Sequence, residues 1–496
     1  MSSLKGVAAF LLGIYVTMGS VAASEPSANL LDQLLAIQRQ SWRGDCKAAL
    51  PAIEIVLKAP EFAQLPDDQK LFGYNIAVGC ALHQSDRDAA YQFVREATTI
   101  QEAQPNLWDL RFHLELQDKR LNEAVDTLNA MAVHGGQALN GLPSRDVNGL
   151  YHQIELTADK NLQKQFLRIV TAPSYVPNEP FDAEDLFKRD YALLLVANGQ
   201  RGPASELVSR MTNVSELMKA SVDPGLQGAL PADFDGRAAL EGQLEHARRI
   251  AASHPGSLFA VIAVSRCLRF LGRAEEALAT LQAADPAQSG RSYTDLYDAQ
   301  SWWWDSMGRS YLMLGRYDDT VRAFRAGMDA QGGEQRNVNQ KINLGFAELA
   351  FGHPDDAIAT VSNFDRFVNP LSAYGAMQVH LLRGCAKIAA GHASAAAEDR
   401  GYVLAHEADD PSSVTKLLAC IGDVNAAAAS LSRRLSKQEW RVSALLDLSE
   451  FDSPPATEPL GIIDKSFAKT RLNHDVQAAA ARLGGVRRFH LQRGEI

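Results

Sequence analysis

The chain has 496 residues and a formal net charge of −10, from 49 basic and 59 acidic residues. Because the two signs are mixed throughout and no basic run exceeds two residues, the sequence lacks the electrostatic footprint of a nucleic-acid-binding protein. A chain of this length would ordinarily form about three globular domains, although one continuous repeat array can use the same length.

Residues 1–23 predict a secretory signal peptide. Lys5 precedes an apolar run, and small residues ending at Ala23 provide a cleavage site. The alternative is an uncleaved membrane anchor, but a bilayer span needs about 20 apolar residues, and Gly13 interrupts this shorter run. We therefore expect an exported protein, periplasmic or secreted, whose mature form begins at Ser24 and does not span the membrane.

Five cysteines are too few for a disulfide scaffold, but two pairs have the spacing of a helical repeat. Cys46 and Cys80 are 34 residues apart, and Cys385 and Cys420 are 35 residues apart. Each pair could join neighbouring helix hairpins in an exported chain. We predict a disulfide for the first pair, whereas two buried thiols are an equal alternative for the second. Cys267 is expected to be a core residue.

Residues 24–225 predict a region of degenerate helical repeats. Apolar residues at helical spacing indicate three hairpins, at 29–57, 69–97 and 107–132. Seven prolines then separate shorter helical segments within 140–235, expected around 150–169, 182–197 and 204–219. The Pro- and Gly-containing stretch 222–236 is the expected boundary between two halves of the chain.

The clearest hairpin of the chain occupies residues 302–324, where two amphipathic helices flank Gly315. Its residue order resembles the tetratricopeptide repeat, which has the pattern W-x2-L-G-x2-Y followed by a late Phe. The matching residues are Trp304, Met307 in the place of Leu, Gly308, Tyr311, Gly315, Tyr317 and Phe324. Gly308 should let the second helix lie directly against the first.

Five segments of residues 235–435 share a turn glycine followed by a second helix rich in Ala or acidic residues. The glycines are Gly272, Gly315, Gly352, Gly391 and Gly422. The resemblance implies an all-α fold, a right-handed superhelical solenoid of antiparallel helix hairpins. Residues 436–496 depart from the repeat pattern, with helices expected at 462–471 and 475–483 and an extended end, and are expected to form a C-terminal capping segment.

The sequence carries no motif that predicts chemistry. It lacks H-E-x-x-H and Cys-x2-Cys metal patterns, a phosphate loop and G-x-S-x-G. Two Ser-x-x-Lys matches, at Ser413 and Ser466, lack the companion elements of penicillin-binding enzymes. No metal site, no cofactor and no catalytic residue is therefore predicted.

The family resemblance implies a binding groove and not a catalytic site. One face of each first helix would line the inner surface, with Phe259, Arg266, Arg269, Phe270, Trp302, Arg309, Met313, Asn339 and Phe346 as the candidate ligand-binding residues. Arg and Trp typically dominate binding energy. The favoured interpretation is a non-enzymatic scaffold or adaptor of the cell envelope that holds a protein or peptide segment. The alternative for these residues is structural, with the arginines paired to nearby acids and the tryptophans packed on neighbouring hairpins.

A rival interpretation is a carbohydrate-active envelope enzyme built on a helical toroid. Aromatic residues would stack on sugar, and Asp295 and Asp305 would serve as acid and base. The stacking residues would be Tyr293, Tyr297, Trp302, Trp303 and Tyr311. Two catalytic carboxylates must lie within about 5–10 Å, whereas ten residues of one straight helix span about 15 Å. This pair therefore requires a break in the helix between its two members.

Overall fold

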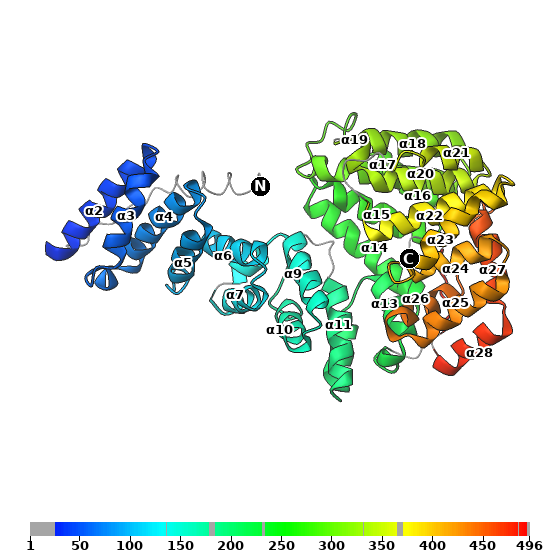
Figure 1. Ribbon diagram of the computed structural model, residues 1–496, viewed down its shortest axis with the longest axis horizontal. Helices are drawn as coiled ribbons and strands as arrows, with labels where there is room; N and C mark the ends of the chain where they lie inside the picture. Colours follow the sequence, from blue (N-terminus) through cyan, green and yellow to red (C-terminus); the bar gives the residue numbers. More distant parts are fainter. Residues whose placement is uncertain are drawn as a thin grey trace. The chain divides into compact units, whose positions relative to one another are not determined.

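The computed structural model describes residues 25–134, 136–177, 184–230, 234–330, 332–364, 371–484 and 486–493. The expected signal peptide, with its cleavage site after Ala23, lies outside the described residues. Within these ranges the chain is built of α-helices, and the one β feature is an isolated parallel bridge between Glu450 and Arg488 (Figure 1). The predicted all-α class is confirmed.

The chain divides into two compact units, Met1–Phe187 and Lys188–Ile496. This division lies earlier than the boundary expected within 222–236. The reason is packing across that stretch, because Met218 and Val222 of α13 (Val214–Val222) share a core with Leu240 of α14 (Gly236–Ser253). A stretch rich in Pro and Gly is here a connection inside one unit.

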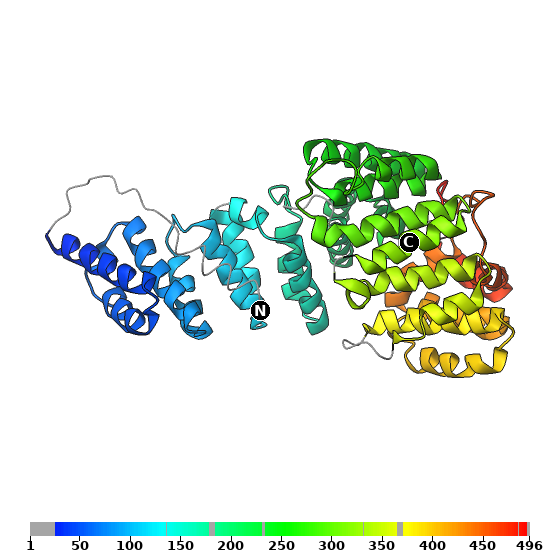
Figure 2. The same cartoon turned by 90° about the horizontal axis from the view of Figure 1, so that it is seen from above.

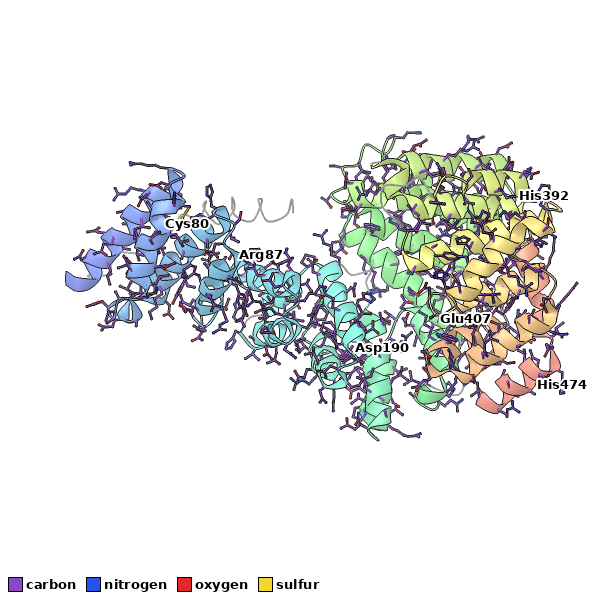
Figure 3. All side chains as sticks on the ribbon, in the orientation of Figure 1. Cys80, Arg87, Asp190, His392, Glu407 and His474 are labelled. Atoms are coloured by element: carbon purple, nitrogen blue, oxygen red, sulfur yellow. A yellow bond between two sulfur atoms is a disulfide. The ribbon has the colours of Figure 1, made fainter. Side chains whose placement is uncertain are left out.

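The first unit is a row of antiparallel helix pairs. The three expected hairpins appear as the pairs α2–α3, α4–α5 and α6–α7. The helices are α2 (Glu25–Trp42), α3 (Cys46–Leu57), α4 (Asp67–His83), α5 (Arg87–Ala97), α6 (Pro105–Gln117), α7 (Leu121–His134), α8 (Gly136–Asn140), α9 (Ser144–Thr157) and α10 (Lys160–Val170), and α11 (Glu184–Ala197) continues into the second unit. Polar contacts link successive pairs, as where Arg87 forms an ion pair with Asp118. Figure 3 labels Arg87 on the ribbon of the first unit.

Two helical segments predicted as continuous are divided in the structure. Residues 150–169 form parts of α9 and α10, because Ala158 has a positive φ of 58° and Asp159 caps the next helix by accepting from the Leu162 N–H at 3.0 Å. Residues 204–219 belong to α12 (Arg201–Ser209) and α13, where Asn213 caps the second helix in the same way. Each capping side chain bonds N–H groups in the first turn of its helix that would otherwise lack a partner. These caps, and not the continuous apolar pattern, decide where the helices begin.

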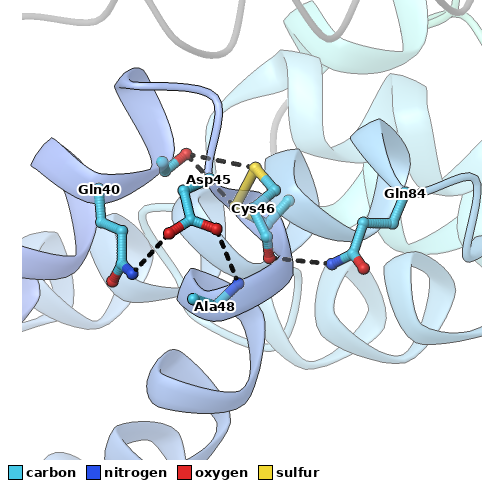
Figure 4. Close-up of a disulfide and its surroundings, with 7 residues drawn as sticks. Gln40, Asp45, Cys46, Ala48 and Gln84 are labelled. Carbon is cyan, nitrogen blue, oxygen red and sulfur yellow. Dashed lines mark hydrogen bonds between the residues drawn. A yellow bond between two sulfur atoms is a disulfide. The ribbon is translucent and has the colours of Figure 1, made fainter.

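The pair Cys46 and Cys80 forms a disulfide that joins α3 to α4. Both residues are buried, and Ser41 lies beside their sulfur atoms (Figure 4). Asp45 caps α3 by accepting from the Ala48 N–H, and the Gln84 amide donates to the Cys46 carbonyl at 3.0 Å. The crosslink therefore sits in a hydrogen-bonded corner where the turns of two hairpins meet.

The second unit contains the repeats that the turn glycines indicated. Its helices after α14 are α15 (Leu258–Phe270), α16 (Ala274–Gln282), α17 (Leu296–Met313), α18 (Tyr317–Asp329), α19 (Gly333–Arg336), α20 (Val338–Ala350), α21 (Pro354–Thr360), α22 (Ala373–Ala389), α23 (Ala397–Ala405), α24 (Pro411–Cys420), α25 (Val424–Ser436), α26 (Gln438–Leu448), α27 (Ile462–Arg471) and α28 (His474–Leu483). Figure 2 shows several of them side by side in rows.

The turn glycines adopt the left-handed conformation that their position requires. Gly272, Gly315, Gly352, Gly391 and Gly422 all have φ between 70° and 85°. Inside the central hairpin, a Cβ on Gly308 would lie 3.0 Å from the Phe324 ring. The close approach of α17 and α18 thus depends on that glycine, as predicted.

The pair Cys385 and Cys420 is also joined by a disulfide, which links α22 to α24, the first helices of successive repeats. Cys267 is free and buried in α15. The structure thus favours the disulfide over two thiols for the second pair.

The second unit closes on itself. α13 packs against α26, and one core cluster combines residues from α13 and α14 with residues from α25 and α26. Phe467 of α27, Val476 of α28 and Phe489 of the last described segment are buried in the same cluster. No described helix combines the length and apolarity that a membrane crossing requires.

We call residues 449–493 the tail. The tail does more than cover the last hairpin. α27 packs against α22, α24 and α25, so it reaches three helices of the array. Residues 450–452 pair with 487–491 through backbone bonds such as Phe489 N–H to Glu450 C=O at 2.8 Å. The extended end predicted from the sequence therefore exists, and the segment expected as a cap contributes side chains to the core of the unit.

Candidate functional site

The second unit contains a cavity of about 780 Å³ between the repeats and the tail. Its walls come from the last turns of α15 and α17, the segment 451–460, α27, and residues 492–493. The lining residues of the repeats are Arg269, Phe270, Arg309, Leu312 and Met313. The structure thus forms a partly open cavity against the tail where the sequence implied a groove along the repeats.

Four of the nine predicted groove residues line this cavity, namely Arg269, Phe270, Arg309 and Met313. The other five, Phe259, Arg266, Trp302, Asn339 and Phe346, lie outside it. Sequence reasoning missed the tail, which supplies the remaining lining residues. The signal for it was weak, since only the aromatic residues at 451, 467 and 489 indicated a segment that would be buried.

The tail is fixed to the ends of the first helices by backbone carbonyls. The Gln492 N–H donates to the Phe270 carbonyl at 2.9 Å, at the end of α15. The Thr457 hydroxyl donates to the Met313 carbonyl at 2.8 Å, at the end of α17. A Cβ at Gly315 would collide with the backbone of Thr457, so the turn glycine also makes room for the tail.

Arg309 is part of a buried network. Its Nε donates to the Asp305 carboxylate at 2.6 Å, and the Asn343 amide donates to the other oxygen of that carboxylate at 2.7 Å. Asp305 is 4% exposed. The Arg269 guanidinium is buried as well and donates to the Ser265 hydroxyl at 3.1 Å. The structural alternative for these arginines, pairing with a nearby acid, therefore holds for Arg309.

Two arginines, Arg434 of α25 and Arg493 of the tail, contact Asp447 of α26. Arg434 donates to this carboxylate at 2.7 Å and Arg493 at 2.8 Å. Burial opposes ionisation of Asp447, but Lys416, Arg434 and Arg493 outweigh it and hold the pKa of the carboxyl well below its usual range. Arg493 thereby anchors the tail by an ion pair that also lines the cavity.

Arg471 lies at the same end of the site. Its guanidinium donates to the carbonyls of Leu448 and Ser449 at 2.9 and 2.7 Å. Burial, together with the charge of nearby Arg493, lowers the pKa of Arg471. The basic groups around Asp447 outnumber this carboxylate, so this end of the cavity carries net positive charge, a condition that favours an anionic group.

Acidic residues also line the cavity, namely Asp452, Glu458 and Asp464, and Lys465 lies next to Asp464. Burial and the negative charge of Asp464 raise the pKa of Glu458. Glu458 is half-buried and Asp464 is exposed, and two neighbouring acids that repel each other favour a bound cation.

The acid and base pair of the rival enzyme interpretation does not exist. α17 is continuous over Leu296–Met313, so no chain break brings Asp295 and Asp305 together. Asp295 accepts from the Ser257 hydroxyl at 2.8 Å and from the Leu258 and Phe259 N–H groups, and thus caps α15. Both carboxylates hold helices in place.

The aromatic residues proposed for sugar stacking are dispersed. Trp303 is buried and donates to the Leu281 carbonyl at 3.1 Å, and Tyr293 donates to the Ala284 carbonyl at 2.9 Å. Trp302 and Tyr297 are exposed, and the Arg336 guanidinium lies over the Tyr297 ring. None of the proposed stacking rings lines the cavity against the tail.

Ser413 of the first Ser-x-x-Lys match is buried and donates to Asp410 at 2.5 Å, at the start of α24. Across the described ranges, no group of three or more His, Cys, Asp or Glu side chains could hold a metal ion.

Stacked antiparallel helix pairs with left-handed glycine turns make the chain a helical repeat protein with a tetratricopeptide-like fold. No protein-family model matches the chain, and no curated protein matches its sequence. The class assignment therefore rests on the chain's own hairpins.

Two solved structures align with most of the chain. One is the Cut9–Hcn1 hetero-tetramer of the APC/C, with 10% sequence identity and a TM-score of 0.29, covering 92% of this chain and 90% of that chain. The other is Naa15/Naa10 bound to HypK-THB, with 12% identity and a TM-score of 0.29, covering 93% of this chain and 80% of that chain.

Proposed function

We propose that this protein is a non-enzymatic scaffold of the cell envelope, periplasmic or secreted, that binds a protein or peptide segment. The observation that carries the proposal is the cavity between the ends of α15 and α17 and the tail. It combines arginines with an apolar wall, and such residues typically contribute most to binding energy.

The envelope location rests on the apolar leader of residues 1–23 and on the two disulfides, because disulfides persist in oxidising compartments outside the cytoplasm. The test is N-terminal sequencing of the protein recovered from the envelope fraction. A sequence beginning at Ser24 supports the proposal, and a chain that remains in the cytoplasm with Met1 rejects it.

The binding function is tested by affinity capture from an envelope extract with the mature protein as bait. The informative variant is Ala468→Trp, because Ala468 is exposed in the cavity wall and a larger side chain there fills the site without removing a contact. The matched control is Ala481→Trp, at an exposed position of α28 outside the cavity. Both variants should melt close to the parent protein.

The expected result is that Ala468→Trp loses a partner that both the parent protein and Ala481→Trp retain. Equal recovery by the two variants would show that the cavity is not the binding site. The absence of any specific partner, with the bait correctly folded, would reject the scaffold function itself.

A further inference from the structure

The cavity of the second unit has charges of opposite sign at its two ends, and α27 sets their separation. This helix turns Asp464, Phe467, Ala468 and Arg471 toward the cavity, at the spacing i, i+3, i+4 and i+7 of one helix face. Seven residues of an α-helix rise about 10 Å. The acidic and basic ends of this stripe are thus about 10 Å apart along the axis.

The acidic end consists of Asp464 and Glu458. Glu458 follows Thr457, which is bonded to the end of α17. With respect to the described part of the chain, neither carboxylate makes a side-chain hydrogen bond or an ion pair. Lys465 also lines the cavity but makes no ion pair with any described residue. Two carboxylates without an ion pair can receive an ammonium group.

The basic end consists of Arg471 and Arg493. Arg493 follows Gln492, whose N–H is bonded to the end of α15. α15 and α17 are packed neighbours, and the axes of packed helices are about 8–10 Å apart. The two points where the tail is attached, at the ends of α15 and α17, are therefore also about 8–10 Å apart. This distance agrees with the separation of the two charged ends along α27.

Apolar side chains line the cavity together with the charged ones. Its wall includes Phe270, Leu312, Met313, Phe451 and Phe467. The site is thus complementary to a ligand with a positive end, an apolar centre and a negative end.

We propose that the cavity binds a short peptide with both termini free, its ammonium group at Glu458 and Asp464 and its carboxylate at Arg471 and Arg493. An extended chain covers about 3.3–3.6 Å per residue, so about three residues match the two ends. The volume of about 780 Å³ lies in the range of small-ligand sites. This inference rests on the proposed function and specifies the class of ligand.

A simpler account of the charges is the stability of α27 itself, because an acid in the first turn and a base in the last turn both suit the helix dipole. α28 has the same arrangement, with Asp475 in its first turn and Arg482 in its last turn, and neither residue lines the cavity. α28 therefore provides a control that separates the two accounts.

The experiment is isothermal titration of the whole mature protein with the tripeptide Ala-Phe-Ala in three forms: free, N-acetylated and C-amidated. Each blocking group should weaken binding at least about tenfold, because it removes a charge-assisted contact. The variant Glu458→Gln with Asp464→Asn should bind the free peptide about tenfold more weakly, but the acetylated peptide as the parent does. The control Asp475→Asn should bind all three like the parent.

Equal affinity for blocked and free peptides would overturn the proposal, as would the absence of binding to all three. A loss in Asp475→Asn as large as in the double variant would favour the helix-stability account. The peptide comparison on the parent protein does not depend on any variant folding. If the tripeptides fail while envelope capture still recovers a partner through the cavity, only the ligand class is rejected and the scaffold function stands.

Discussion

The replacement Arg309→Ala tests whether the buried network under the cavity is structural. It leaves Asp305, 4% exposed, with the neutral Asn343 amide as its remaining partner in the network. Removing one member of a buried ion pair costs about 3–5 kcal/mol. Because the Arg309 side chain is 26% exposed, solvent screening reduces this to about 2–3 kcal/mol.

The expected change in melting temperature follows from the size of the unit. One kcal/mol corresponds to roughly 2–4 °C for a domain of 150–250 residues, and the second unit, Lys188–Ile496, is larger than that. Arg309→Ala should therefore lower the melting temperature by several degrees, at most roughly 12 °C. Circular dichroism at 222 nm measures it. Arg266→Ala is the control, because Arg266 is half-buried on neighbouring α15 and forms no ion pair with any described residue.

A second variant identifies the cause. Combining Asp305→Asn with Arg309→Ala removes the buried charge, so the double variant should be more stable than Arg309→Ala alone. A difference in melting temperature of about 1 °C is ordinary for a surface substitution. If Arg309→Ala melts within about 1 °C of Arg266→Ala, the argument from the buried carboxylate is refuted.

Three further outcomes are expected. Replacing Cys46 and Cys80 by serine should lower the free energy of unfolding of the first unit by roughly 3–4 kcal/mol in urea titrations, and equal midpoints for the variant and the oxidised parent would contradict this. His113 bonds two aspartates that raise its pKa to about 10, so its stabilisation is complete below about pH 6.5 and is lost as pH rises toward 10. His113→Gln should flatten that part of the stability profile, and an unchanged slope would refute the assignment. Gly422→Ala should lower the free energy of unfolding by roughly 1–2 kcal/mol, because Gly422 has a positive φ. Gly315→Ala should lower it by more, because Gly315 also has a positive φ and lies against the tail. Equal losses of stability in the two variants would exclude that contact.

The hairpins could be predicted from the sequence because their determinants are local. Gly315 marks its turn through a backbone requirement, and apolar spacing marks the helices on either side. The divisions before Asp159 and Asn213 were missed for a reason that is also local. Each side chain caps a new helix by bonding N–H groups of its first turn, and apolar spacing does not reveal such a cap.

The candidate site could be predicted only in part. Arg269, Phe270, Arg309 and Met313 follow from the position of the first helices, which periodicity gives. The tail residues depend on contacts between distant parts of the chain, such as Thr457 with Met313, and no local pattern indicates them. The pair Asp305 and Arg309 has the i, i+4 spacing of a helix ion pair, but its burial depends on the packing of α20 against α17.

The closure of the second unit has a consequence for how it folds. In an open repeat array each unit contacts only its neighbours, so the ends can fray and folding can begin at any repeat. Here the Gln227 amide bonds the Leu483 carbonyl across 256 positions, and the Arg487 guanidinium bonds the Ser221 carbonyl across 266. Contacts of such sequence separation raise the contact order and slow folding, since a long loop must close before they form. The two ends of this array therefore protect each other, because residues after α26 complete the core that α13 and α14 begin.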